Sequence, residues 1–155
     1  SQDSSFSNGY TYSGHPVAAA AALKNIEIIE NEELLEHVRQ VTPHFQSRLH
    51  ELRKLPLVGD TRGAGLIGCV EGRIVNHDNP KALEIDMEMG ARIDEHCQKL
   101  GLIVRPLLNM CVFSPPLIIT LEQIDEMFDI LEQGIIEATK DLRREGLWKD
   151  TNEQT

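Results

Sequence analysis

The chain has 155 residues, which is long enough for one domain with a sizeable core and too short for two such domains. Its net charge of -10 and pI of about 5.0 argue against nucleic acid or an anionic membrane surface as a partner. The longest apolar run, Pro16 to Leu23, is far below the roughly 20 residues that span a bilayer. Three cysteines far apart in sequence predict reduced thiols in a cytoplasmic protein, and the histidine spacings give no metal site.

The segment from Asn8 to Pro16, NGYTYSGHP, is a polar loop that leads into an alanine-rich helix, expected from Pro16 to Glu30. Pro16 suits the first turn of a helix because it lacks the amide that would be unpaired there. Such a loop can hold an anion through amides and hydroxyls alone. From the residues alone, a turn or capping role for Thr11 is the simpler interpretation. The first turns of the helix are apolar on every side, which predicts burial on several sides.

Hydrophobic spacing and turn residues predict the remaining elements. Pro43 should kink or break the second helix, and Asn109 should take the left-handed backbone of a tight turn. Thr120 and Gln123 form an expected capping box. The predicted elements are a helix over residues 33–55, strands over 57–62 and 66–71, a loop over 72–81, a helix over 83–100, strands over 102–105 and 110–113, and a helix from Thr120 that Gly146 ends.

This order predicts an α+β fold, with a small, mostly antiparallel sheet covered by helices on one face and preceded by a long helix. We expect residues 1–32 to form a loop and connecting helix, residues 33–146 to form the domain, and residues 147–155 to form a polar tail.

Gly63, Gly65 and Gly68 match the spacing of the dinucleotide fingerprint GxGxxG. That motif must follow a strand and open a helix. Here the residues after Gly65 are apolar and favour a strand. A glycine-rich turn between two strands is therefore the better interpretation.

Four blocks of sequence resemble, in order, the C-terminal part of the pyridoxal-phosphate-dependent aminotransferases of class III. The blocks read NGYTYSGHPVAAAAALKNIEIIE, VGDTRGAGLIGCVE, GLIVRPL and SPPLIITLEQIDEMFDIL. Within that class the resemblance is to the omega-amino acid and diamine:pyruvate transaminases. It implies a small C-terminal domain of fold type I and pyridoxal 5'-phosphate as the cofactor. It further implies a homo-oligomer that takes an amine and a 2-oxo acid as substrates.

The resemblance also assigns roles to three residues. It places Thr11, and Tyr10 chiefly through its backbone amide, at the phosphate of a cofactor held mainly by the other subunit. It places Arg105, at the end of the GLIVRPL strand, where the family has an arginine that receives the substrate carboxylate. Guanidinium suits this task because its planar fork makes two parallel bonds to a carboxylate. The alternative for Arg105 is a surface arginine that ends a strand.

None of the six lysines matches the family segment whose lysine forms a Schiff base with the cofactor. In the family that segment precedes the region matched here. We therefore expect a part of a transaminase that is folded but catalytically inert when isolated, without cofactor. The alternative is a free-standing, non-catalytic interaction module or gene remnant that reuses the small-domain fold.

Overall fold

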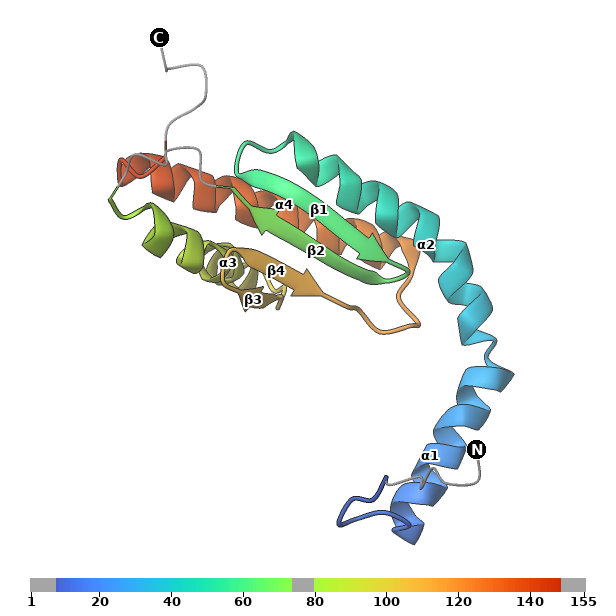
Figure 1. Cartoon of the computed structure of the whole chain (residues 1–155). Helices are drawn as coiled ribbons and strands as arrows, with labels where there is room; N and C mark the ends of the chain where they lie inside the picture. Colours follow the sequence, from blue (N-terminus) through green and yellow to red (C-terminus); the bar gives the residue numbers. More distant parts are fainter. Residues whose placement is uncertain (1–7, 74–79, 149–155) are drawn as a thin grey trace, which may run out of the picture. The chain divides into compact units, whose positions relative to one another are not determined.

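The computed structural model describes residues 8–73 and 80–148 (Figure 1). The chain divides into two compact units, residues 1–35 and residues 36–155. The first unit contains the polar loop and helix α1, and the second contains the sheet, helices α3 and α4, and helix α2 apart from its first two residues. The expected polar tail from residue 149 onward and most of the loop predicted over residues 72–81 lie outside the described residues.

Helix α1 (Pro16–Asn31) confirms the predicted alanine-rich helix. It begins at Pro16 because His15 takes an extended backbone and its ring nitrogen Nδ1 accepts a hydrogen bond from the Ala18 amide. Within its own unit none of its residues is buried, and Val17 and Leu23 expose 71% and 69% of their surface. The first unit by itself therefore does not supply the burial that the apolar first turns predict.

Helix α2 (Leu34–Glu51) continues through Pro43, so the predicted break does not occur. A short 3-10 helix, η1 (Leu52–Lys54), follows it. Val41, Phe45 and Leu49 recur at steps of four and are buried in the core. Their packing holds residues on both sides of Pro43 in one helix and outweighs the lost backbone hydrogen bond.

The second unit is built on a four-stranded antiparallel sheet with strand order β1-β2-β4-β3. Strands β1 (Val58–Ala64) and β2 (Ile67–Gly72) form a hairpin in which Gly63 faces Gly68 and Gly65 takes a φ of 58°. The GxGxxG spacing is thus a turn between two strands, as the sequence predicts. Gly65 is needed there because L side chains rarely adopt that backbone conformation.

The strand predicted over residues 102–105 is wrong: β3 runs from Arg105 to Leu107 and pairs with β4 (Met110–Phe113). Leu102 and Val104 instead form hydrogen bonds with helix α3 (Ala82–Lys99). The Leu102 amide donates to the Cys97 carbonyl, and the Val104 amide donates to the Asp94 carboxylate. The local apolar pattern of Leu102 to Val104 resembles a strand, but its hydrogen-bond partners lie on a helix.

The turn between β3 and β4 also differs from the prediction, because Leu108 and not Asn109 takes the left-handed backbone, with a φ of 56°. Asn109 is held by its partner strand. Its carbonyl accepts from the Gly72 amide at 2.8 Å, and its side-chain amide donates to the Gly72 carbonyl at 3.3 Å. With Asn109 fixed in this way, the strained residue is its neighbour.

Helix α4 (Leu121–Arg144) begins with the predicted capping box, in which the Thr120 hydroxyl accepts from the Gln123 amide at 3.2 Å and the Gln123 side chain accepts from the Thr120 amide at 3.0 Å. Figure 1 shows α4 behind the sheet. The core between them contains Phe45, Phe113 and Phe128, whose ring centroids lie 5.2 to 6.0 Å apart. The α+β fold with helices on one face of an antiparallel sheet is confirmed.

The three cysteines are free thiols. Cys97 and Cys111 are buried in this core, whereas Cys69 is only half-buried. Among residues 8–73 and 80–148, none of the helices combines the length and the hydropathy that a membrane span requires.

Candidate functional site

The polar loop before α1 is closed by three hydrogen bonds around Tyr10, Ser13 and His15. The Tyr10 amide donates to the Ser13 hydroxyl at 2.9 Å, and the Ser13 amide donates back to the Tyr10 carbonyl at 2.9 Å. The His15 amide donates to the Tyr12 carbonyl at 3.2 Å. Ser13, one of the hydroxyl residues of the polar loop, and His15, to which the sequence assigned no role, therefore set the shape of the loop.

Thr11 lies at the bend of this loop and is an exposed residue. Its side chain does not cap α1, because His15 does so. Within the described residues, the Thr11 hydroxyl and the amides of Thr11 and Tyr12 make no hydrogen bond. The loop thus offers two backbone amides and one hydroxyl beside the N-terminus of a helix, a donor set that suits a phosphate.

The Tyr10 amide is in a different state, since it already donates to Ser13. A phosphate oxygen at this amide would have to replace the Ser13 hydroxyl as acceptor. The Tyr10 ring is 78% exposed and leaves the approach to the loop open.

Arg105, in the second unit, is the first residue of the edge strand β3. It faces Val112 in the register of β3 and β4, so the two side chains lie on the same side of the sheet. Among the described residues, Arg105 makes no hydrogen bond or ion pair. An open hollow surrounds it, lined by Ile103, Val104, Arg105, Val112, Phe113 and Ser114.

Other charged groups on this side of the sheet are already paired. Arg62 donates to Asp60 at 3.2 Å and also to Glu71, and Arg53 donates to Asp60 at 2.8 Å. The hydrogen bond from Arg62 is the main reason that the pKa of Asp60 lies below its ordinary value. These carboxylates are therefore satisfied without Arg105, which keeps its fork available for an anion.

The lysines of the described residues lie on helices or at their ends. Lys24, Lys54, Lys99 and Lys140 each pair with a glutamate at 2.8 to 3.2 Å and expose 58% to 64% of their side chains. Lys81 lies at the N-terminal cap of α3. Lys149 is outside the described residues.

The chain was compared with known protein families, and residues 2–135 match the family described as aminotransferase class-III. The chain belongs to the class III aminotransferases. The region matched is the C-terminal part of these enzymes, as the sequence blocks predicted.

Among curated relatives, the putrescine–pyruvate aminotransferase of Pseudomonas aeruginosa is 42% identical over 130 residues, which are 83% of this chain and 28% of the relative. Gamma aminobutyrate transaminase 1 of Solanum lycopersicum, a mitochondrial protein, is 37% identical over 88% of this chain and 26% of the relative. The chain therefore spans less than a third of the length of these relatives.

Solved structures also match most of this chain over less than a third of their own length. A PMP-bound aminotransferase from Vibrio fluvialis superposes with a TM-score of 0.76 at 38% identity, over 88% of this chain and 30% of that one. An omega-aminotransferase from Paracoccus denitrificans gives a TM-score of 0.76 at 36% identity over the same shares. At this identity the likeness extends beyond fold class to the family.

Class III aminotransferases use pyridoxal 5'-phosphate. When bound, this cofactor supplies a ring that withdraws electrons from the carbon bearing the amino group. The loop fits the phosphate end of the cofactor, because the Thr11 hydroxyl and the amides of Thr11 and Tyr12 make no hydrogen bond within the described residues and lie close to a helix N-terminus. Tyr10 and Thr11 belong to the first unit and Arg105 to the second.

Proposed function

We propose that this chain is the C-terminal part of a transaminase that transfers an amino group from an amine or omega-amino acid to a 2-oxo acid such as pyruvate. The 42% identity to a putrescine–pyruvate aminotransferase, together with the unpaired donors of the Asn8 to Pro16 loop, supports this proposal. Residues 1–32 supply the loop and connecting helix, and residues 33–146 form the small domain.

Thr11 binds the cofactor phosphate through its hydroxyl, which needs no rearrangement to do so. Tyr10 contributes its amide once the Ser13 hydroxyl gives way to a phosphate oxygen. The N-terminal end of α1 carries partial positive charge, which stabilises the phosphate dianion without a basic side chain. The task of the loop is to bind and orient the cofactor.

Arg105 binds the carboxylate of the oxo acid. Its guanidinium forms two parallel hydrogen bonds with a carboxylate, and Val112, which lies on the same side of the sheet, lines the hollow beside it. Putrescine has no carboxylate. The charge of Arg105 must therefore remain solvated when that amine occupies the site, because an unpaired buried guanidinium is costly.

The isolated chain is catalytically inert and holds no cofactor, because none of its lysines matches the family segment that bonds to the cofactor. Incubation with pyridoxal phosphate followed by borohydride should label no single lysine, and putrescine should not be turned over. Labelling of one specific lysine together with turnover would contradict this statement.

A free-standing interaction module is the second candidate, and the hydrophobic core that the second unit forms among its own residues favours it. The coding sequence upstream of Ser1 separates the two readings. A reading frame that contains a lysine-bearing large domain supports the transaminase, and a start codon close to Ser1 supports the module.

The complete enzyme is a homo-oligomer in this proposal, since none of the α1 residues is buried within its own unit and exposed apolar surface of this kind drives association. Sedimentation should show self-association that Leu23→Glu with Ile26→Glu abolishes. A wild-type chain that stays monomeric at high concentration counts against association through α1.

The main test uses a chimera in which this chain replaces the matching segment of the Pseudomonas aeruginosa enzyme. Thr11→Ala removes one charge-assisted hydrogen bond and should weaken cofactor retention by about 1–2 kcal/mol, roughly 5- to 30-fold. Arg105→Lys keeps the charge but removes the fork. It should raise KM for pyruvate at least tenfold and leave the half-reaction with putrescine nearly unchanged. Unaltered cofactor affinity and pyruvate KM would remove both residues from the site.

A further inference from the structure

The hollow around Arg105 has a second polar residue, Ser114. It lies just beyond the end of β4 and lines the hollow together with Arg105 and Val112. Ser114 is an exposed residue, and its hydroxyl makes no hydrogen bond within residues 8–73 and 80–148. Arg105 likewise makes no hydrogen bond or ion pair there. The hollow therefore contains two polar side chains whose hydrogen-bonding groups are available.

The residues that follow Ser114 explain why its hydroxyl has no local partner. A serine hydroxyl in a loop commonly accepts a hydrogen bond from the backbone amide two residues further along. Here the next two residues are Pro115 and Pro116, which have no backbone N–H group. The Ser114 hydroxyl is therefore left for another group.

Prolines also fix the backbone of the hollow at both polar residues. Arg105 precedes Pro106, and Ser114 precedes Pro115. A residue before proline is restricted to extended conformations. Such a residue has less conformational freedom to lose when its side chain binds a ligand. The hollow is therefore preorganised where its hydrogen-bonding groups lie.

The strand register places the two polar residues beside each other. Arg105 faces Val112 in the pairing of β3 with β4, and Ser114 follows Val112 by two residues. Phe113, between these two, packs in the core against Phe128. On an extended backbone Ser114 then lies on the same side as Val112, at a diagonal Cα separation from Arg105 of about 7–8 Å. A carboxylate bound by the arginine fork lies within reach of the serine hydroxyl.

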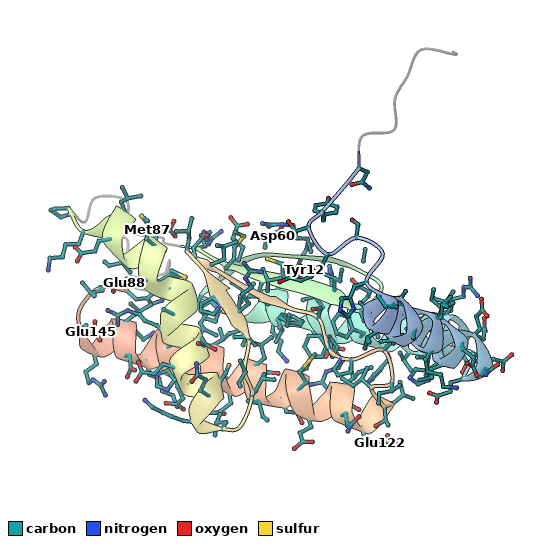
Figure 2. All side chains as sticks on the ribbon, turned by 90° about the horizontal axis from the view of Figure 1, so that it is seen from below. Tyr12, Asp60, Met87, Glu88, Glu122 and Glu145 are labelled. Atoms are coloured by element: carbon teal, nitrogen blue, oxygen red, sulfur yellow. The ribbon has the colours of Figure 1, made fainter. Side chains whose placement is uncertain are left out.

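The charge of the hollow suits a monoanion. The six residues that line it include one cation and no acidic residue. Asp60, labelled in Figure 2, belongs to β1 at the opposite edge of the sheet and is bound by Arg53 and Arg62. A carboxylate has about four acceptor positions on its two oxygens, and an arginine fork uses two of them. A further position is open to a hydroxyl donor.

We propose that Ser114 is a second carboxylate-binding residue of the 2-oxo acid site, and that its hydroxyl donates a hydrogen bond to the carboxylate that Arg105 binds. This proposal rests on the proposed function. An amine without a carboxylate, such as putrescine, gains nothing from this bond. Ser114 therefore contributes to the half-reaction with pyruvate and not to the half-reaction with putrescine.

The test uses the chimera with the Pseudomonas aeruginosa enzyme. Ser114→Ala removes the hydroxyl and should raise KM for pyruvate by about five- to tenfold, with kcat and the putrescine half-reaction nearly unchanged. Ser114→Thr keeps the hydroxyl on a residue that favours extended backbone, so it should retain the wild-type KM. Ser47→Ala, at an exposed serine of α2, is the matched control and should leave KM and kcat unchanged.

Three outcomes of these assays would overturn the proposal: a wild-type KM for pyruvate in Ser114→Ala, an equal loss in the putrescine half-reaction, or a Ser114→Thr variant as impaired as Ser114→Ala. If Arg105→Lys raises KM for pyruvate and Ser114→Ala does not, the proposed function stands and this role of Ser114 is wrong.

A second measurement needs no turnover. Phenylglyoxal modifies arginine, and peptide mass spectrometry follows its reaction with Arg105 in the chimera at increasing pyruvate concentration. Ser114→Ala should raise the pyruvate concentration that gives half protection by a similar factor, and Ser47→Ala should not. Equal protection in these two variants, or none in the wild type, overturns the proposal. Protection that depends on Ser114 in a chimera that does not transaminate refutes the proposed function and leaves the carboxylate site standing.

Discussion

Gly90 lies in the interior of helix α3, where alanine would ordinarily stabilise the helix by about 1 kcal/mol. The structure predicts the opposite result for Gly90→Ala. The helix approaches the turn between β3 and β4 so closely that an added Cβ would lie 2.4 Å from the Met110 carbonyl oxygen and 2.7 Å from that of Leu108. The Gly90 amide also donates to the Leu108 carbonyl at 2.9 Å.

The expected magnitude follows from these contacts. Ordinary van der Waals separation is roughly 3.5 Å, so the helix and the turn must move apart by about 1 Å. Overpacking against atoms that cannot rotate away costs about 1–3 kcal/mol, and weakening the hydrogen bond to Leu108 costs about 1 kcal/mol more. After subtracting the gain in helix propensity, we expect the free energy of unfolding to fall by about 2 kcal/mol.

Urea unfolding of the isolated chain, followed by circular dichroism, measures this change. The matched control is Ala91→Gly at the next, exposed position, which should lose about 1 kcal/mol through helix propensity alone. The sign of the Gly90→Ala effect is therefore diagnostic. A Gly90→Ala variant as stable as the wild type, or more stable, would refute the close approach of α3 to the β3–β4 turn.

Two further outcomes follow from titratable groups. The hydrogen bond from His96 lowers the pKa of Asp141, so the ionised carboxylate stabilises the fold fully above the ordinary carboxyl pKa, and this stabilisation is lost as the pH falls through the lowered pKa. The free energy of unfolding measured between pH 2 and 6 should therefore depend less on pH in Asp141→Asn than in the wild type. Parallel pH curves of the two proteins would contradict this. Burial raises the pKa of Cys97 to about 12 and also raises that of Cys111. A thiol reagent at pH 8 should therefore modify only Cys69 in the folded chain. Rapid reaction of two thiols would show that the core is not closed.

Elements specified by local patterns were predictable from the sequence. The capping box at Thr120 and the glycine hairpin around Gly65 depend on residues within a few positions of each other, so their chemistry can be read directly. The strand predicted over residues 102–105 failed because the partner of the Val104 amide is Asp94, ten residues away on a helix. Such a contact leaves no trace in the hydrophobic pattern.

Pro43 is a second position at which the local sequence did not predict the structure. Local rules predict a kink or a break in the helix at this residue, and the break does not occur, because α2 continues from Leu34 to Glu51. The residues that hold it, Phe45 and Leu49, are buried against other elements of the fold. Burial against the rest of the fold outweighs the helix-breaking preference of Pro43, and the sequence of α2 alone does not show how strongly its residues will be buried.

For the candidate site, the resemblance to class III aminotransferases pointed to Tyr10, Thr11 and Arg105. The structure then showed which of their hydrogen-bonding groups already have partners. The sequence could not show that Ser13 occupies the Tyr10 amide or that His15, and not Thr11, caps α1. These details depend on the loop conformation. They divide the loop into donors used for folding and donors that remain available.

Thr11 and Arg105 are exposed, and the described fold makes no hydrogen bond or ion pair with either side chain. A hydroxyl or guanidinium that stabilises a fold normally has an internal partner, as Thr120 has Gln123 and Arg62 has Glu71. Replacing Thr11 or Arg105 should therefore leave the free energy of unfolding within about 0.5 kcal/mol of the wild type. Any effect of these substitutions on an assembled enzyme would then come from what the two residues bind, since the fold itself does not depend on them.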